Sequence, residues 1–264
     1  MLLLAARAAP RHPREGPAIE FLIGLLIATA IGLTGVGGGT ITTPLLILVL
    51  GRPAQIAVGT ALSFAAIIDL LVVPMYMLRR QVHYRTLGWM LLGGVPGVVL
   101  GGLVLRRFPL NSHMLYVILG VTIVFAAGLN MYRLIRLKGA SGTTDRGRIL
   151  PFVLFPVGAE VGFTSAGAGA LGSLALLGLT RLSAAQVVGT DLTNALALTT
   201  IGGGIQLIAG NCDLPLLAKL LTGGVAGAIL GSVLAMRLPS RPLKWALAAW
   251  LGFLGIQLFV RGLS

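Results

Sequence analysis

Long apolar runs separated by short polar stretches make up almost the whole chain. Six of these runs are uninterrupted, at residues 56–78, 87–105, 114–135, 185–209, 214–236 and 243–260. Each is close to the roughly 20 residues that a helix needs to cross a bilayer. The pattern therefore predicts an all-α, polytopic membrane protein.

Each half of the chain begins with an apolar run that glycines interrupt. In the first half, residues 19–33 are followed by the glycine-rich residues 34–39 and a short apolar run at 40–50. The matching parts of the second half are 149–163, 164–169 and 171–179. A run of about ten residues cannot cross roughly 30 Å of hydrocarbon as a helix. We therefore expect a broken or re-entrant first helix in each half, and we call residues 34–39 and 164–169 the two interruptions.

The two halves repeat one another at a constant offset of 130 residues. Between residues 32–109 and 162–239, 21 positions are identical, most of them glycine or threonine. Such residues let helices approach closely or stop inside a bilayer. We therefore expect two homologous four-segment repeats. The predicted organisation is a basic leader at 1–18, repeat 1 at 19–135, a linker at 136–148 and repeat 2 at 149–264.

The orientation of the repeats stays open at this stage. If each half crosses the membrane four times, the repeats run parallel. If the interrupted segment is a re-entrant hairpin, each half crosses three times and the repeats are inverted. The basic residues divide 12 to 7 between the two sides of the membrane in both models, so the positive-inside rule does not choose between the models. Both models place the basic linker in the cytoplasm.

Composition excludes several other classes of protein. Apolar residues form 56% of the chain and charged residues only 10%, against about 25% charged residues in a soluble domain. The net charge is +13, and nearly all of the 20 lysine and arginine residues lie between the apolar runs, where they set membrane orientation, so we expect no nucleic acid partner. Cys212 is the single cysteine, and the three histidines have no ligand spacing. We therefore expect no disulfide, no metal and no cofactor.

The interruptions are the best candidates for a binding site. Backbone broken at membrane depth survives only where protein or a water-filled cavity satisfies it, and the helix that follows presents a positive N-terminus to an anion. The expected substrate-binding residues are Thr34, Gly37, Gly38, Gly39, Thr60, Thr164, Ser165, Gly167, Gly169, Thr190 and Asn194. Buried acidic residues in membranes often carry protons, and the candidates are Asp69, Glu160 and Asp191. The alternative is that these glycines and threonines serve only helix packing.

Ser165 lies in the sequence GFTSAG and suggests the nucleophile of an intramembrane protease. A serine nucleophile needs a base, and the last histidine of the chain is His113. We therefore expect that the protein is not an enzyme.

Two stretches carry a resemblance to a known family. They are GLTGVGGGTITTPLLILVLGRPAQIAVGTALSFAA in the first half and GFTSAGAGALGSLALLGLTRLSAAQVVGTDLTNALA in the second. The chain resembles the TauE/SafE sulfite and organosulfonate exporters, also called the toluene-sulfonate uptake permease family. The second half departs from the pattern, with Leu174 in place of the proline at Pro44 and with Asp191 after its Gly-Thr.

The resemblance implies export of a small sulfur-containing anion, such as sulfite or an organosulfonate, by a multi-pass protein of a bacterial inner membrane. The expected partners are that anionic substrate and the lipid bilayer. A homodimer is one possible assembly. A passive anion channel, a transporter of another small anion and a membrane scaffold are the alternatives.

Overall fold

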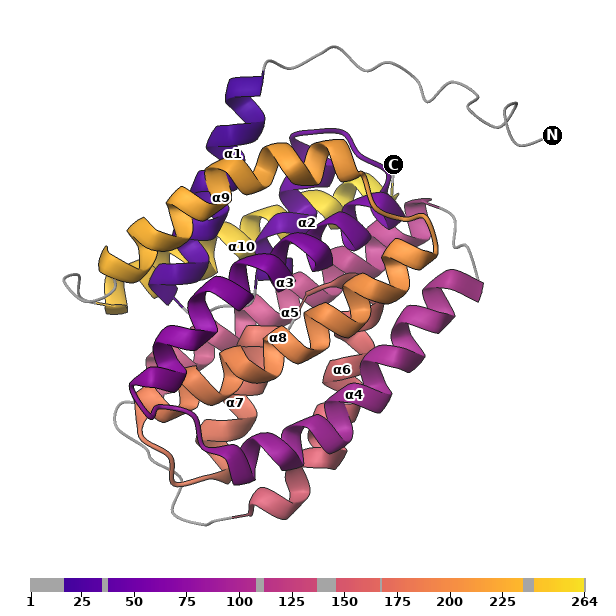
Figure 1. Cartoon of the computed structure of the whole chain (residues 1–264). Helices are drawn as coiled ribbons and strands as arrows, with labels where there is room; N and C mark the ends of the chain where they lie inside the picture. Colours follow the sequence, from indigo (N-terminus) through magenta and orange to yellow (C-terminus); the bar gives the residue numbers. More distant parts are fainter. Residues whose placement is uncertain are drawn as a thin grey trace.

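A computed structural model describes residues 17–34, 38–107, 112–136, 146–166, 168–234 and 240–263, and all regular secondary structure in them is helical (Figure 1). The helices of the first half are α1 (Pro17–Thr34), α2 (Gly38–Leu48), α3 (Ala54–Leu78), α4 (Tyr84–Arg107) and α5 (Ser112–Arg136). Those of the second half are a short 3-10 helix η1 (Gly147–Ile149), α6 (Leu150–Thr164), α7 (Ala168–Leu179), α8 (Ala184–Ile208), α9 (Leu214–Leu234) and α10 (Ser240–Leu263).

The all-α class and the order of long and short helices agree with the sequence prediction. The helices α2 and α7 begin earlier than expected, so Gly38, Gly39 and Gly169 belong to their first turns and not to a break. The N–H groups of a first turn have no intrahelical partner in any case, so a glycine there interrupts little. Gly37 and Gly167 lie outside the described residues, as does the side chain of Thr34.

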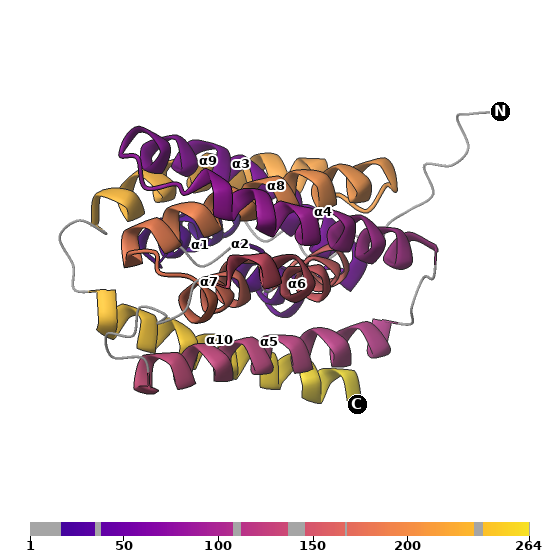
Figure 2. The same cartoon turned by 90° about the horizontal axis from the view of Figure 1, so that it is seen from below.

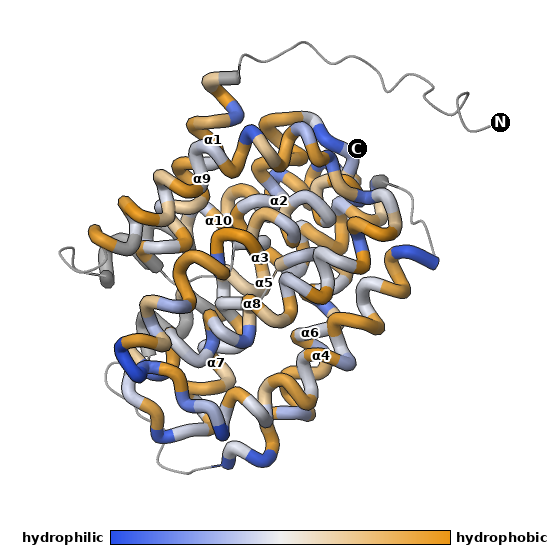
Figure 3. Tube along the Cα trace, in the orientation of Figure 1, coloured by the Kyte–Doolittle hydropathy of each residue, from blue (hydrophilic) through white to orange (hydrophobic). Residues whose placement is uncertain are grey.

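Four stretches of the described residues are long and apolar enough to cross a membrane. They are Ala54–Leu78, Tyr84–Arg107, Gly147–Thr164 and Leu214–Gly231. Figure 3 shows mostly apolar positions along the helices and many of the hydrophilic ones at helix ends and in loops. The helix α8 is not among the four although it has 25 residues. It carries several buried polar side chains, which makes it an inner helix of the bundle.

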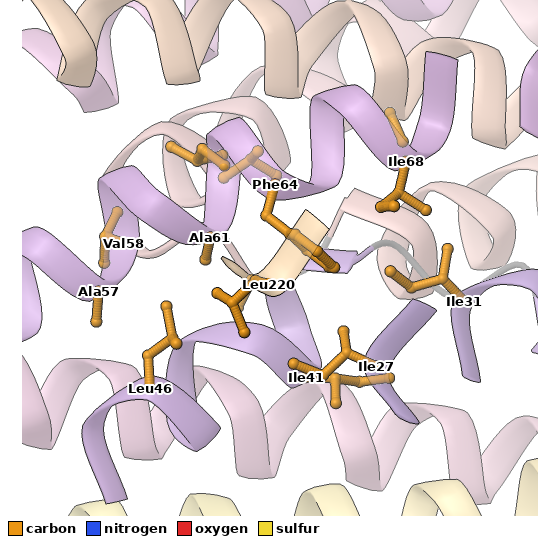
Figure 4. Packing of buried hydrophobic residues seen from close by; sticks show 14 of the residues in the cluster. Ile27, Ile31, Ile41, Leu46, Ala57, Val58, Ala61, Phe64, Ile68 and Leu220 are labelled. Carbon is orange, nitrogen blue, oxygen red and sulfur yellow. The ribbon is translucent and has the colours of Figure 1, made fainter. Parts of the chain in front are cut away.

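The helices lie in layers (Figure 2). The pair α5 and α10 forms one outer layer, α1, α2, α6 and α7 lie in the middle, and α3, α4, α8 and α9 form the other side. Inside, apolar side chains from both halves share one core, which includes Ile31, Phe64, Ile68 and Leu220 (Figure 4).

Two helix pairs join the halves through glycine. On α4, a Cβ added to Gly93, Gly97 or Gly101 would overlap backbone of α6 at Pro151, Phe155 and Ala159, respectively. On α9, the same holds for Gly223, Gly227 and Gly231 against Phe21, Leu25 and Thr29 of α1. Small residues permit such close backbone approach. In both pairs the residue numbers rise together, so the paired helices run parallel.

The central pair α3 and α8 runs antiparallel. Leu62 of α3 faces Gly202 of α8, and each helix begins where the other ends. The backbone N–H of Asp213, in the loop directly before α9, donates to the Thr60 hydroxyl at 3.0 Å. The N–H of His83, in the loop directly before α4, donates to the Thr190 hydroxyl at 2.9 Å. These hydrogen bonds hold each interhelical loop against the first turns of the opposite helix.

Candidate functional site

The second interruption has a defined backbone. Ser165 adopts a left-handed conformation with φ of 63° and ends α6, where its N–H donates to the Val161 carbonyl at 2.8 Å. The Thr164 hydroxyl donates to the Glu160 carbonyl at 2.9 Å and accepts from the N–H of Ala166 at 3.1 Å. The Thr164 side chain therefore replaces part of the helical bonding that is lost at the break.

The described edges of the two interruptions touch. The hydroxyls of Thr43 and Ser165 share a hydrogen bond, and the Ser165 hydroxyl also lies 3.4 Å from the Gly39 carbonyl. A Cβ on Gly39 would overlap the Ser165 carbonyl. All three residues are buried. The sequence-predicted candidates Gly39 and Ser165 are thus brought together from opposite halves.

Asp191 is fully buried on α8, where it meets α7. The Ser173 hydroxyl donates to its Oδ2 at 2.5 Å. A Cβ on Gly172 would overlap its Oδ1, so the glycine makes room for the carboxylate. Asp191 is therefore held in a fixed position one turn before Asn194.

Two further predicted residues are fully buried and lack hydrogen-bond partners among the described residues. Asn194 has none at either Nδ2 or Oδ1, and Asp69 has none at either carboxylate oxygen. Across from Asp69, on α8, the Thr199 hydroxyl is a near polar group, but it donates to the Ala195 carbonyl at 2.8 Å. A buried polar group without a partner lowers the stability of a protein by about 1–3 kcal/mol. Both positions therefore point to function.

Glu160 lies near the end of α6 and is half-buried, with its Oε1 buried and without a hydrogen-bond partner in the described part of the chain. By contrast, the hydroxyls of Thr60 and Thr190 are engaged by loop N–H groups. The candidate threonines at these two positions hold loops in place in this structure.

Some buried polar residues were not predicted from the sequence. They are Thr43, Ser173, Thr199 and Gln206. The repeat at an offset of 130 residues could have indicated three of them, because Thr43 matches Ser173 and Asp69 matches Thr199. These pairs are polar in both halves without being identical, so a search for identities alone passes over them.

Charged side chains pair near the helix ends. Arg52 lies 3.1 Å from Asp213, and Lys219 lies 2.7 Å from the buried Glu20. The buried polar side chains of the described residues include no lysine or arginine. No group of His, Cys, Asp and Glu side chains in those residues has the geometry to hold a metal ion.

Apolar spans that enclose buried carboxylates, an amide without a partner among the described residues and two interrupted helices are the features of a membrane transporter. Comparison with known proteins agrees. The family model described as "Sulfite exporter TauE/SafE" matches residues 20–258. A "Probable membrane transporter protein YjnA" of Bacillus subtilis (strain 168) is 34% identical over 254 residues, covering 90% of this chain and 97% of that relative. No solved structure matches significantly. The chain belongs to the TauE/SafE family of membrane transporters.

Proposed function

We propose that this transporter exports a small sulfur-containing anion, such as sulfite or an organosulfonate, across a bacterial cytoplasmic membrane, as a multi-pass protein. The family description supports the substrate class. The observation that carries the proposal is the buried contact of the two interruptions at Gly39, Thr43 and Ser165. Interrupted helices that meet inside a bundle are the common substrate site of transporters built from repeats.

In this proposal the halves are inverted repeats, related by an approximate two-fold axis in the membrane plane. Contacts that recur at the offset of 130 residues support it. The hydrogen bond of Thr60 with Asp213 matches that of Thr190 with His83. The equivalent helices α3 and α8 run antiparallel, as do α5 and α10, where Gly120 meets Phe259 and Gly255 meets Val124. An axis along the membrane normal would make equivalent helices parallel.

The direction of α1 supports a re-entrant hairpin in each half. The helix α1 runs parallel to α9 along its glycine contacts. The helix α3 also runs parallel to α9, because Thr60 meets Asp213 at the start and Phe64 meets Gly224 further on. A chain that enters along α1 and enters again along α3 must return in between through α2. Each half then crosses the membrane three times, which is the number that inverted repeats require.

Two hairpins that enter from opposite sides and touch at their inner ends would place the interruptions near the bilayer midplane. There the positive dipole ends at the N-termini of α2 and α7 would attract an anion. Neutral donors suit the site, because the buried polar side chains of the described residues include neither lysine nor arginine.

The acidic residues Asp69, Glu160 and Asp191 carry the coupling proton in this proposal. A buried carboxylate is far less unfavourable when neutral, so protonation would accompany passage of an anion through the same region. The membrane potential favours export of the anion by itself, since each negative charge that leaves the cell gains about 2.3 kcal/mol per 100 mV. A coupled proton must therefore enter in exchange for the anion, because a proton that left with it would cancel the charge that is moved.

Proteoliposomes test the proposal. Purified protein should carry sulfite with a saturable rate, and an imposed pH gradient should change that rate. A rate that rises linearly with sulfite concentration, together with single-channel conductance, would favour an anion channel. The absence of flux for sulfite, methanesulfonate and taurine would refute the substrate class.

A further inference from the structure

The two halves differ at one pair of matched positions that both face glycine. Residue 64 and residue 194 are equivalent at the offset of 130, as are Gly224 and Gly94. In one half, a Cβ on Gly224 of α9 would lie 2.8 and 2.9 Å from ring atoms of Phe64 on α3. In the other half, a Cβ on Gly94 of α4 would lie 3.1 and 3.4 Å from the methyl groups of Leu198 and 3.6 Å from Oδ1 of Asn194, both on α8.

The Phe64 ring fills the space in front of Gly224 in the first of these two places. The ring is fully buried and points into the apolar cluster with Ile31, Ile68 and Leu220 (Figure 4). The phenyl ring offers no hydrogen-bond donor to a ligand, and it fills the place in front of Gly224.

Asn194 makes the equivalent position polar. Its side chain is smaller than phenylalanine and fully buried, and its Nδ2 and Oδ1 have no hydrogen-bond partner among the described residues. Buried side-chain amides in folded proteins are almost always satisfied by protein or water. An amide that the protein leaves free, opposite a glycine, is fit to receive a ligand.

We propose that the transported oxyanion binds once per chain, at Asn194 and Gly94 between α8 and α4, and that Phe64 blocks the equivalent position of the other half. This inference rests on the proposed function. Nδ2 donates to an oxygen of the anion. Gly94 keeps a side chain out of the space that Leu198 and Asn194 border on α8.

The amide also restricts the chemical form of the ligand. Oδ1 needs a donor while Nδ2 needs an acceptor. The hydrogen sulfite ion supplies both, and so does a sulfonate that carries an amino group. The sulfate dianion has only acceptors, and its second charge is unfavourable close to the buried carboxylate of Asp191. The site therefore selects a ligand with a singly charged anionic group and its own donor.

Sulfite-dependent thermal unfolding of the purified full-length protein tests the site, at a pH where hydrogen sulfite is abundant. Asn194→Leu keeps the size of the side chain and removes both polar atoms. We expect it to unfold at a higher temperature than the wild type without ligand, because an unsatisfied group is gone. We also expect its sulfite affinity to fall by about ten-fold or more.

Phe64→Leu is the matched control in the other half. It should unfold at a lower temperature, because it leaves a core cavity, but keep the sulfite affinity of the wild type. If Asn194→Leu does not fold, Asn194→Asp serves instead, since it keeps the shape and adds a repelling charge. Sulfite affinity that either Asn194 variant retains within about two-fold would overturn the site.

Two further outcomes separate the inference from the proposed function. Wild-type protein that neither binds nor transports sulfite contradicts the proposed function itself. Wild-type protein that binds sulfate as tightly as hydrogen sulfite overturns the donor and acceptor argument.

Discussion

Thr43 and Ser165 share a buried hydrogen bond between their hydroxyls although 122 residues separate them in the sequence. Gly39, one turn before Thr43, packs against the backbone carbonyl of the same serine. The approach of the two interruptions thus depends on the absence of a side chain at one glycine.

Gly39→Ala should abolish transport. Its Cβ would overlap a backbone atom that cannot move aside, so the two interruptions would be forced apart. The measurement is sulfite flux into proteoliposomes together with the yield of monodisperse protein. Gly204→Ala on α8 is the control, because its Cβ would meet nothing within 4 Å. That variant should be active and more stable by about 0.5–1 kcal/mol.

Asp69→Asn should keep the stability of the protein and remove the coupling of transport to protons. The amide replaces a buried carboxylate that has no hydrogen-bond partner among the described residues, so the unfolding temperature should stay equal or rise. Transport should lose its response to a pH gradient, because an amide cannot carry a proton. Asp213→Asn, which removes the ion pair with Arg52 near a helix end, should keep that response. A response to the gradient in Asp69→Asn equal to that of the wild type would exclude Asp69 as the proton carrier.

Thr60→Val and Thr190→Val should destabilise the protein by similar amounts, about 1 kcal/mol each. Each change removes the acceptor of a loop N–H, from Asp213 in one case and His83 in the other. Unfolding in SDS and detergent mixtures measures the loss. Thr200→Val should have little effect, because this exposed hydroxyl donates to the Leu196 carbonyl of its own helix. Unequal losses at the two matched threonines would count against the two-fold relationship.

A cysteine at Ser141 should be protected in intact cells. The linker at 136–148 is rich in basic residues, which favours a cytoplasmic location. In a Cys212→Ala background, an impermeant thiol reagent should label Ser141→Cys only after the cells are opened. Labelling of intact cells would place the linker outside.

The sequence predicted the helices well and their partners poorly. Apolar length and glycine clusters specify where a helix runs and where it stops, which is why α2 and α7 were expected as short helices. The glycines at 93, 97 and 101 indicate a face that packs closely. They do not indicate which helix packs there, because every helix offers backbone to a glycine face. The pairing of α4 with α6 therefore could not be predicted from the sequence and is known from the structure.

The candidate site was predicted in part for a similar reason. Asp69, Asp191 and Asn194 were recognised because ionisable and amide side chains are rare in spans. Thr43 and Ser173 were not recognised, because a threonine or serine that bonds its own helix looks the same in sequence as one that bonds across the protein. Their burial against Ser165 and Asp191 separates the two cases.

The pairing of α1 with α9 can form only late in the synthesis of this protein. Leu214 follows Thr34 by 180 residues, which is roughly 10 to 40 s of synthesis. During that time α1 has no contact with the glycine face of α9, and Glu20 has no ion pair with Lys219. A nascent chain cut off before α9 would display a lone carboxylate to lipid or to the insertion machinery. Quality control could therefore distinguish finished from unfinished chains by whether Glu20 is covered.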